Sequence, residues 1–164
     1  MTDPILDRVL RHMAWANAGL FERLRTLDDA ALALSAPRNE WTVAMIIEHL
    51  VSAAERYAAR LEGAPRDPGK APPAAIAELD ALAARCAAAD ARIRAQAALP
   101  DGIFHNPSFG SEPHARSTVI GQAIHHATEH RAQIAGALAT NGRDVIDLDA
   151  LDAWSYGEAE GEDA

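Results

Sequence analysis

Apolar residues recur three or four positions apart over long stretches of the chain, which is the spacing of an amphipathic helix. The first stretch covers residues 4–27, and Pro4 suits its first turn. The second begins after Trp41, with Thr42 as the predicted N-cap, and ends near Gly63. Each stretch predicts a helix that buries one face.

Two more stretches extend this pattern. Residues 73–99 are rich in alanine, the residue with the highest helix propensity, and a Pro-Asp-Gly sequence ends them. Residues 117–140 contain no proline and stop at an Asn-Gly pair, and a short helix is predicted around residues 148–156. We therefore predict an all-α fold, a four-helix bundle of antiparallel type, in which residues 1–164 form a single domain.

The longest connection between predicted helices covers residues 100–116. It contains Phe104, His105, Phe109 and His114. Loops longer than about 12 residues in a compact domain are often functional. This one is expected to form a short hairpin or a lid over one end of the bundle, and its two histidines are loop residues that could reach a substrate.

Charge is concentrated at the C-terminal end. Of a formal net charge of −9, residues 144–164 contribute eight acidic side chains and no lysine or arginine. Acidic side chains repel phosphate backbones, and no basic stripe occurs elsewhere, so nucleic-acid binding is not expected. From about residue 157 the acidic tail is predicted to be flexible.

Composition excludes several classes of site and of protein. The single cysteine, Cys86, excludes an intramolecular disulfide and a multi-cysteine zinc site, and its helical position suggests a core residue. No apolar run approaches the roughly 20 residues of a membrane span, and the N-terminus lacks the pattern of a signal peptide. A cytoplasmic protein without a membrane partner is expected.

Histidines carry the strongest chemical signal. His126 and His130 lie four residues apart on the fourth predicted helix, so both imidazoles face the same side and can bind one metal ion. His49, within the apolar face of the second helix, is the preferred third ligand. Imidazole nitrogen suits zinc, nickel, iron or cobalt. The alternative ligands are Glu48, Glu129, His125 and His12.

Several short motifs, in this order along the chain, resemble those of the DinB superfamily of metalloenzymes. The segment that begins at His126 is the most specific of them, and Ala132 stands in it where glycine is usual. The motifs are Trp15-Ala16-Asn17, Trp41-Thr42 followed by His49-Leu50, His126-Ala127-Thr128-Glu129-His130-Arg131-Ala132-Gln133-Ile134, and Asp147-Leu148 with Trp154-Ser155-Tyr156.

This resemblance implies a four-helix bundle in which His49, His126 and His130 bind a divalent ion, usually zinc or nickel. Several members of the superfamily transfer bacillithiol or mycothiol, one branch isomerises maleylpyruvate, and homodimers are common. The first hypothesis is therefore a metal-dependent transferase that joins a low-molecular-weight thiol to a small electrophile. The alternatives are a thiol-dependent isomerase, a non-catalytic metal-binding or stress-response dimer, and a bundle whose histidines bind nothing.

Overall fold

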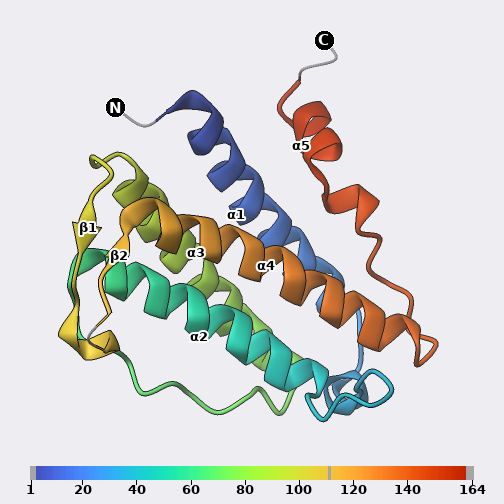
Figure 1. Ribbon diagram of the computed structural model, residues 1–164. Helices are drawn as coiled ribbons and strands as arrows, with labels where there is room; N and C mark the ends of the chain where they lie inside the picture. Colours follow the sequence, from blue (N-terminus) through green and yellow to red (C-terminus); the bar gives the residue numbers. More distant parts are fainter. Residues whose placement is uncertain (1–2, 111, 162–164) are drawn as a thin grey trace.

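Four long helices pack around one core in the computed structural model, which describes residues 3–110 and 112–161 (Figure 1). They are α1 (Pro4–Leu24), α2 (Val43–Glu62), α3 (Leu79–Ala97) and α4 (Arg116–Ala139). The short elements are η1 (Asp29–Ala33), η2 (Ile76–Glu78), β1 (Ile103–Phe104), η3 (Pro107–Phe109), β2 (His114–Ala115), η4 (Asp149–Leu151) and α5 (Ala153–Ala159). The prediction of a predominantly α-helical protein is confirmed.

Local sequence signals fix most helix ends. At the start of α1, the Asp3 carboxylate accepts hydrogen bonds from the backbone N–H groups of Ile5 and Leu6. Thr42 caps α2 as predicted, because its hydroxyl accepts from the Met45 N–H at 3.3 Å. Gly63 ends α2 in the left-handed conformation, at φ 71°, where a side chain would be strained.

Two predicted boundaries are wrong. The first helix stops at Leu24 rather than residue 27, because the next turns tighten and the Thr26 hydroxyl donates to a carbonyl of the last turn. The third helix begins at Leu79 rather than residue 73. Ala75 is extended, and the Glu78 carboxylate accepts from two backbone N–H groups upstream of it. Alanine content alone did not reveal this competing turn.

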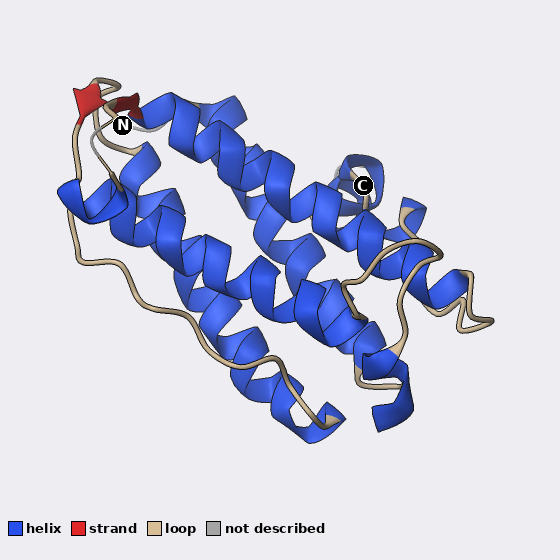
Figure 2. Ribbon diagram, turned by 60° about the horizontal axis from the view of Figure 1, so that its bottom comes forward, coloured by secondary structure: helices blue, strands red, loops and turns tan. Residues whose placement is uncertain are grey.

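The helices α2 and α3 run in the same direction. Arg85 of α3 pairs with Glu48 of α2, and Arg92, further along α3, pairs with Glu62, further along α2. The connection between them, here called the return loop (residues 64–75), therefore runs back along the outside of α2 (Figures 1 and 2). Helix α4 runs opposite to α2 beside it. The predicted antiparallel arrangement thus fails for the α2–α3 pair.

The core lies between the four helices and is almost entirely aliphatic. Its fully buried side chains come from every long helix, and each contributes roughly 1.5–3 kcal/mol when removed from water. None of the described helices combines the length and apolar character that a bilayer span requires. The largest buried side chains include Leu20, Phe21, Ile46, Ile47, Leu79, Ile93, Ile134 and Leu138.

The long connection before α4 contains the predicted short hairpin. Ile103 pairs with Ala115 and Phe104 with His114 in an antiparallel ladder at the end of α2. Asn106 fixes the loop, since its side-chain amide donates to the carbonyl of Ala64 at 3.0 Å. This loop closes one end of the helical core.

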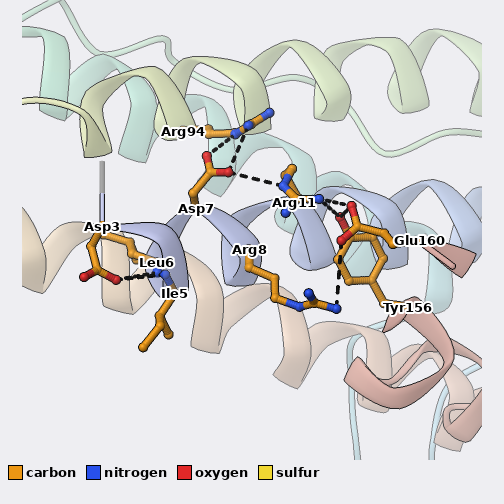
Figure 3. Close-up of polar contacts among 9 residues, drawn as sticks. All are labelled: Asp3, Ile5, Leu6, Asp7, Arg8, Arg11, Arg94, Tyr156 and Glu160. Carbon is orange, nitrogen blue, oxygen red and sulfur yellow. Dashed lines mark hydrogen bonds and ion pairs between the residues drawn. The ribbon is translucent and has the colours of Figure 1, made fainter. Parts of the chain in front are cut away.

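The C-terminal part of the described chain forms α5, which contacts α1. Gly157 is a buried residue of α5, and Glu160 forms an ion pair with Arg11 of α1 (Figure 3). Arg11 also donates to the Tyr156 hydroxyl at 2.7 Å, and Tyr156 donates to Glu160 at 2.6 Å. The flexibility predicted for the tail from about residue 157 stays a prediction. Residues 162–164 lie outside the described part.

Candidate metal centre

Three histidines meet between α2 and α4. His49 projects from α2, while His126 and His130 project from one face of α4, one turn apart. The Nε2 atom of His126 lies 3.0 Å from Nε2 of His49 and 2.9 Å from Nε2 of His130. One nitrogen from each ring lies within 4.8 Å of the others. The antiparallel placement of the two helices creates this cluster.

The nitrogen separations fit a shared ion. At a metal–nitrogen bond of about 2.1 Å and tetrahedral angles, two imidazole nitrogens lie about 3.4 Å apart. The two separations from His126, 2.9 and 3.0 Å, are somewhat shorter than that spacing, and all three nitrogens lie within 4.8 Å of one another. An ion held by these three histidines alone would keep further coordination positions, as catalytic zinc sites do.

Gln133 sets the orientation of one ring. Its Oε1 atom lies 2.7 Å from Nδ1 of His130, and its amide donates to Glu129 at 3.3 Å. An amide oxygen accepts, so Nδ1 of His130 carries the proton and Nε2 presents its lone pair to the cluster. Contacts of this kind around metal-binding histidines fix the tautomer of the ligand.

Aromatic rings enclose the cluster. Trp41 lies edge-on to His49, with ring centroids 4.8 Å apart, and stacks near His130 at 6.5 Å. Tyr57 approaches His126 edge-on at 5.5 Å. These rings limit the rotamers of the imidazoles. Trp41 belongs to a motif noted in the sequence, but its contact with the histidines was not predicted.

The surroundings keep two of the imidazoles neutral. Burial is the main reason that the pKa of His49 is lowered, with smaller contributions from His130 and Arg56. The pKa of His126 falls to about 3, again through burial first and then through His130, His49 and Arg56. Neutral imidazole is the form that binds metal, so the lowered pKa values of His49 and His126 favour metal binding near pH 7.

A pocket opens beside the cluster, between α2 and the return loop. It has a volume of about 250 Å³, and His49 forms part of its wall. The apolar part of its wall comes from Trp41, Met45 and Pro72. The charged part comes from Arg56, Lys70 and Glu48. A small molecule in this pocket would lie against the His49 ring.

The alternative ligands lie elsewhere. Glu48 is buried in an ion pair with Arg85, at 3.0 Å. His12 bonds the backbone carbonyl of Leu151 at 2.9 Å, on the side of α1. His125 and Glu129 are exposed on α4, although Glu129 supports Gln133. None of the four belongs to the cluster.

The remaining candidates are also separate from the three histidines. His105 is exposed and lies 3.1 Å from the carbonyl of Gly110, within its own loop. His114 lines a different small pocket with Tyr57 and Arg60. Cys86 is buried as expected, and burial together with Asp90 raises the pKa of its thiol well above the usual value. It is therefore not a thiolate at neutral pH.

A buried polar network behind the cluster explains two other motif residues. Arg131 of α4 donates to Asn17 of α1 at 2.7 Å, and Asn17 donates to Asp90 of α3 at 2.9 Å. These side chains are no more than 4% exposed. Asn17 and Arg131 belong to the motifs that resemble the DinB superfamily, but the sequence alone indicated no role for them. Polar residues inside an apolar helix face are a recognisable signal of such a network.

A comparison with protein-family models identifies the family of the chain. The model of the DinB family matches residues 1–161, nearly the whole length. The chain belongs to the DinB family. No curated protein and no solved structure gave a significant match to it.

Proposed function

We propose that this DinB protein binds a divalent metal ion, zinc or nickel, through His49, His126 and His130. We further propose that it uses the ion to transfer a low-molecular-weight thiol to a small electrophile. The arrangement of α1–α4 is then that of a DinB-like four-helix bundle with its metal between α2 and α4. The gathering of three imidazole nitrogens within 4.8 Å of one another carries the proposal.

In the proposed reaction, the ion would activate the thiol and the protein side chains would position the ligands. A divalent ion with a free coordination position lowers the pKa of a thiol, so that the sulfur reacts as thiolate. Gln133 would hold the His130 lone pair toward a bound ion, and Trp41 packs edge-on against the His49 ring. The thiol proton passes to solvent. The carbon–sulfur bond forms as the leaving group departs with its bonding electrons.

Metal titration of alanine variants tests the binding step. We expect His49→Ala, His126→Ala and His130→Ala each to lose tight zinc binding while far-ultraviolet circular dichroism stays unchanged, because alanine is the better helix former. His125→Ala is the matched control, since this exposed histidine lies on the same helix next to His126. Unchanged affinity in any of the three cluster variants would contradict the site.

Turnover tests the second step. The zinc- and nickel-loaded proteins should join thiols to an activated aryl chloride, with chloride release matching thiol consumption. His126→Ala should lose this activity and His125→Ala should keep it. Metal binding without turnover across a broad thiol panel would leave a metal-binding protein and reject the transferase.

A further inference from the structure

The pocket beside His49 has an unusual charge distribution. Five charged side chains of α2, α3 and the return loop lie at or just behind its wall, and four of them form one network. Arg85 binds Glu48 and Glu55 together, at 3.0 and 2.8 Å, and Lys70 lies 3.7 Å from Glu55. Two carboxylates therefore face two cations in these ion pairs, and Asp67 of the return loop adds a negative charge near Glu55.

Arg56 is the fifth charge and stands apart from this network. It is half-buried on the pocket wall and donates one hydrogen bond, to the Ser52 hydroxyl at 3.1 Å. Among the ion pairs of the described residues, none involves Arg56. A half-buried guanidinium has further donors in a planar fork that matches a carboxylate. The pocket wall thus carries one guanidinium that forms no ion pair with a carboxylate of the described residues.

The positions of His49 and Arg56 define the shape of a suitable molecule. Seven residues separate them on α2, which places their Cα atoms about 10 Å apart, nearly two helical turns. Both line the same pocket, and Trp41, Met45 and Pro72 supply apolar surface there. A molecule with its thiol at the histidine cluster and an apolar segment in the pocket would bring its other end to Arg56.

We propose that Arg56 is the specificity-determining residue that binds a carboxylate on the thiol substrate, with Lys70 as a weaker second cation. This assignment rests on the proposed thiol chemistry for its sulfur end. A single carboxylate balances the single unpaired charge, and a neutral thiol leaves Arg56 without an anion. The substrate class is therefore an acidic thiol whose carboxylate lies several bonds from the sulfur.

Cobalt-loaded protein provides the main test, because a thiolate bound to cobalt gives a charge-transfer absorption that reports binding without turnover. The probes are mercaptoacetate, mercaptopropionate and mercaptohexanoate, each paired with the mercaptoalcohol of equal length. We expect the long carboxylate to bind at least about tenfold more tightly than its alcohol, as a charged hydrogen bond would give. The advantage should shrink in the shortest pair, which cannot span the pocket.

Substitutions locate the effect. Arg56→Gln should remove the carboxylate advantage and leave alcohol binding unchanged, while Lys70→Gln should reduce it only in part. Arg66→Gln is the matched control, since it removes the same charge from an exposed position of the return loop that does not line the pocket. Equal binding of acid and alcohol by the wild type, or an unchanged advantage in Arg56→Gln, would overturn the inference and leave the metal site standing.

A metal-free arm separates this inference from the proposed function. Hexanoate, without any thiol, should shift the Arg56 Nε–H resonance in the apo protein, and hexanol should not. If hexanoate shifts that resonance while no thiol gives the cobalt absorption, the carboxylate site holds and the thiol chemistry fails. Inorganic phosphate that displaces hexanoate at lower concentration would replace carboxylate by phosphate and overturn the assignment.

Discussion

Single side chains next to the histidines decide what the cluster can bind. His126 faces both other rings through one nitrogen, and His130 is turned toward it by Gln133. The ring of His130 thus offers a lone pair rather than a proton. At this scale the site depends on an amide that touches no metal.

Gln133→Ala should weaken zinc binding about 10- to 100-fold, the usual effect of removing a hydrogen-bond partner from a metal ligand. The ring of His130 would then be free to change tautomer and rotate. Competition with a chromophoric chelator measures the affinity. Gln122→Ala, an exposed position one turn before His126, is the control, and equal losses in both variants would contradict a specific role for Gln133.

Asp90 should make stability depend on pH. Burial raises its pKa from 3.8 to about 6, against the opposing effects of Asn17, Arg131 and Cys86. The folded state therefore holds a proton that the unfolded state has already lost between about pH 4 and pH 6. Over that window the contribution of Asp90 to the free energy of unfolding should fall by about 3 kcal/mol as the pH rises.

Asp90→Asn isolates this effect because asparagine does not titrate there. The difference in unfolding free energy, wild type minus variant, should be largest near pH 4 and should decline toward neutral pH. Urea unfolding at several pH values measures it. Parallel curves for the two proteins would show that Asp90 does not titrate in this range.

At the scale of elements, the sequence predicted the features that depend on neighbouring residues, such as helix caps and apolar faces. Thr42, Gly63 and the apolar stripes set α2, and the four-residue spacing on α4 placed His126 and His130 on one face. The return of the chain between α2 and α3 was not predictable in this way, because helix direction depends on packing between distant segments. The same holds for Arg56, whose lack of a carboxylate partner appears only when the helices are assembled.

Helix α5 is stabilised by its contacts with α1. Seven residues are too few for a stable isolated helix, so its formation depends on docking against α1. Tyr156 provides much of that contact, with its ring 5.4 Å from Trp15 and its hydroxyl bonded to Arg11. The acidic end is therefore held by one buried aromatic residue and by the ion pairs of Glu160 with Arg8 and Arg11.

Tyr156→Ala should lower the free energy of unfolding by about 3 kcal/mol and remove hydrogen-exchange protection from residues 153–159. Tyr156→Phe, which loses only the hydroxyl, should cost about 1 kcal/mol and keep the helix. Zinc affinity should stay the same in both, because α5 lies away from the histidine cluster. A loss of metal in Tyr156→Ala would link the two regions and contradict their independence.

For the whole molecule, a bound ion would join α2 to α4 and so stabilise the folded chain. Zinc at 1,000 times its dissociation constant should raise the free energy of unfolding by about 4 kcal/mol, because it binds only the folded cluster. Denaturant unfolding with zinc or with chelator measures the gain. His130→Ala should show no gain, and stabilisation of that variant would place the ion elsewhere.

The parallel course of α2 and α3 has a consequence for how this scaffold can diversify. Because the chain must travel the length of the helices between them, residues 64–75 form a long surface segment that also provides Gly69, Lys70 and Pro72 to the pocket. This segment contributes no histidine to the cluster. The sequence of residues 64–75 can therefore vary independently of the three histidines. Substitutions there would change which molecules the pocket binds and leave the metal site unchanged.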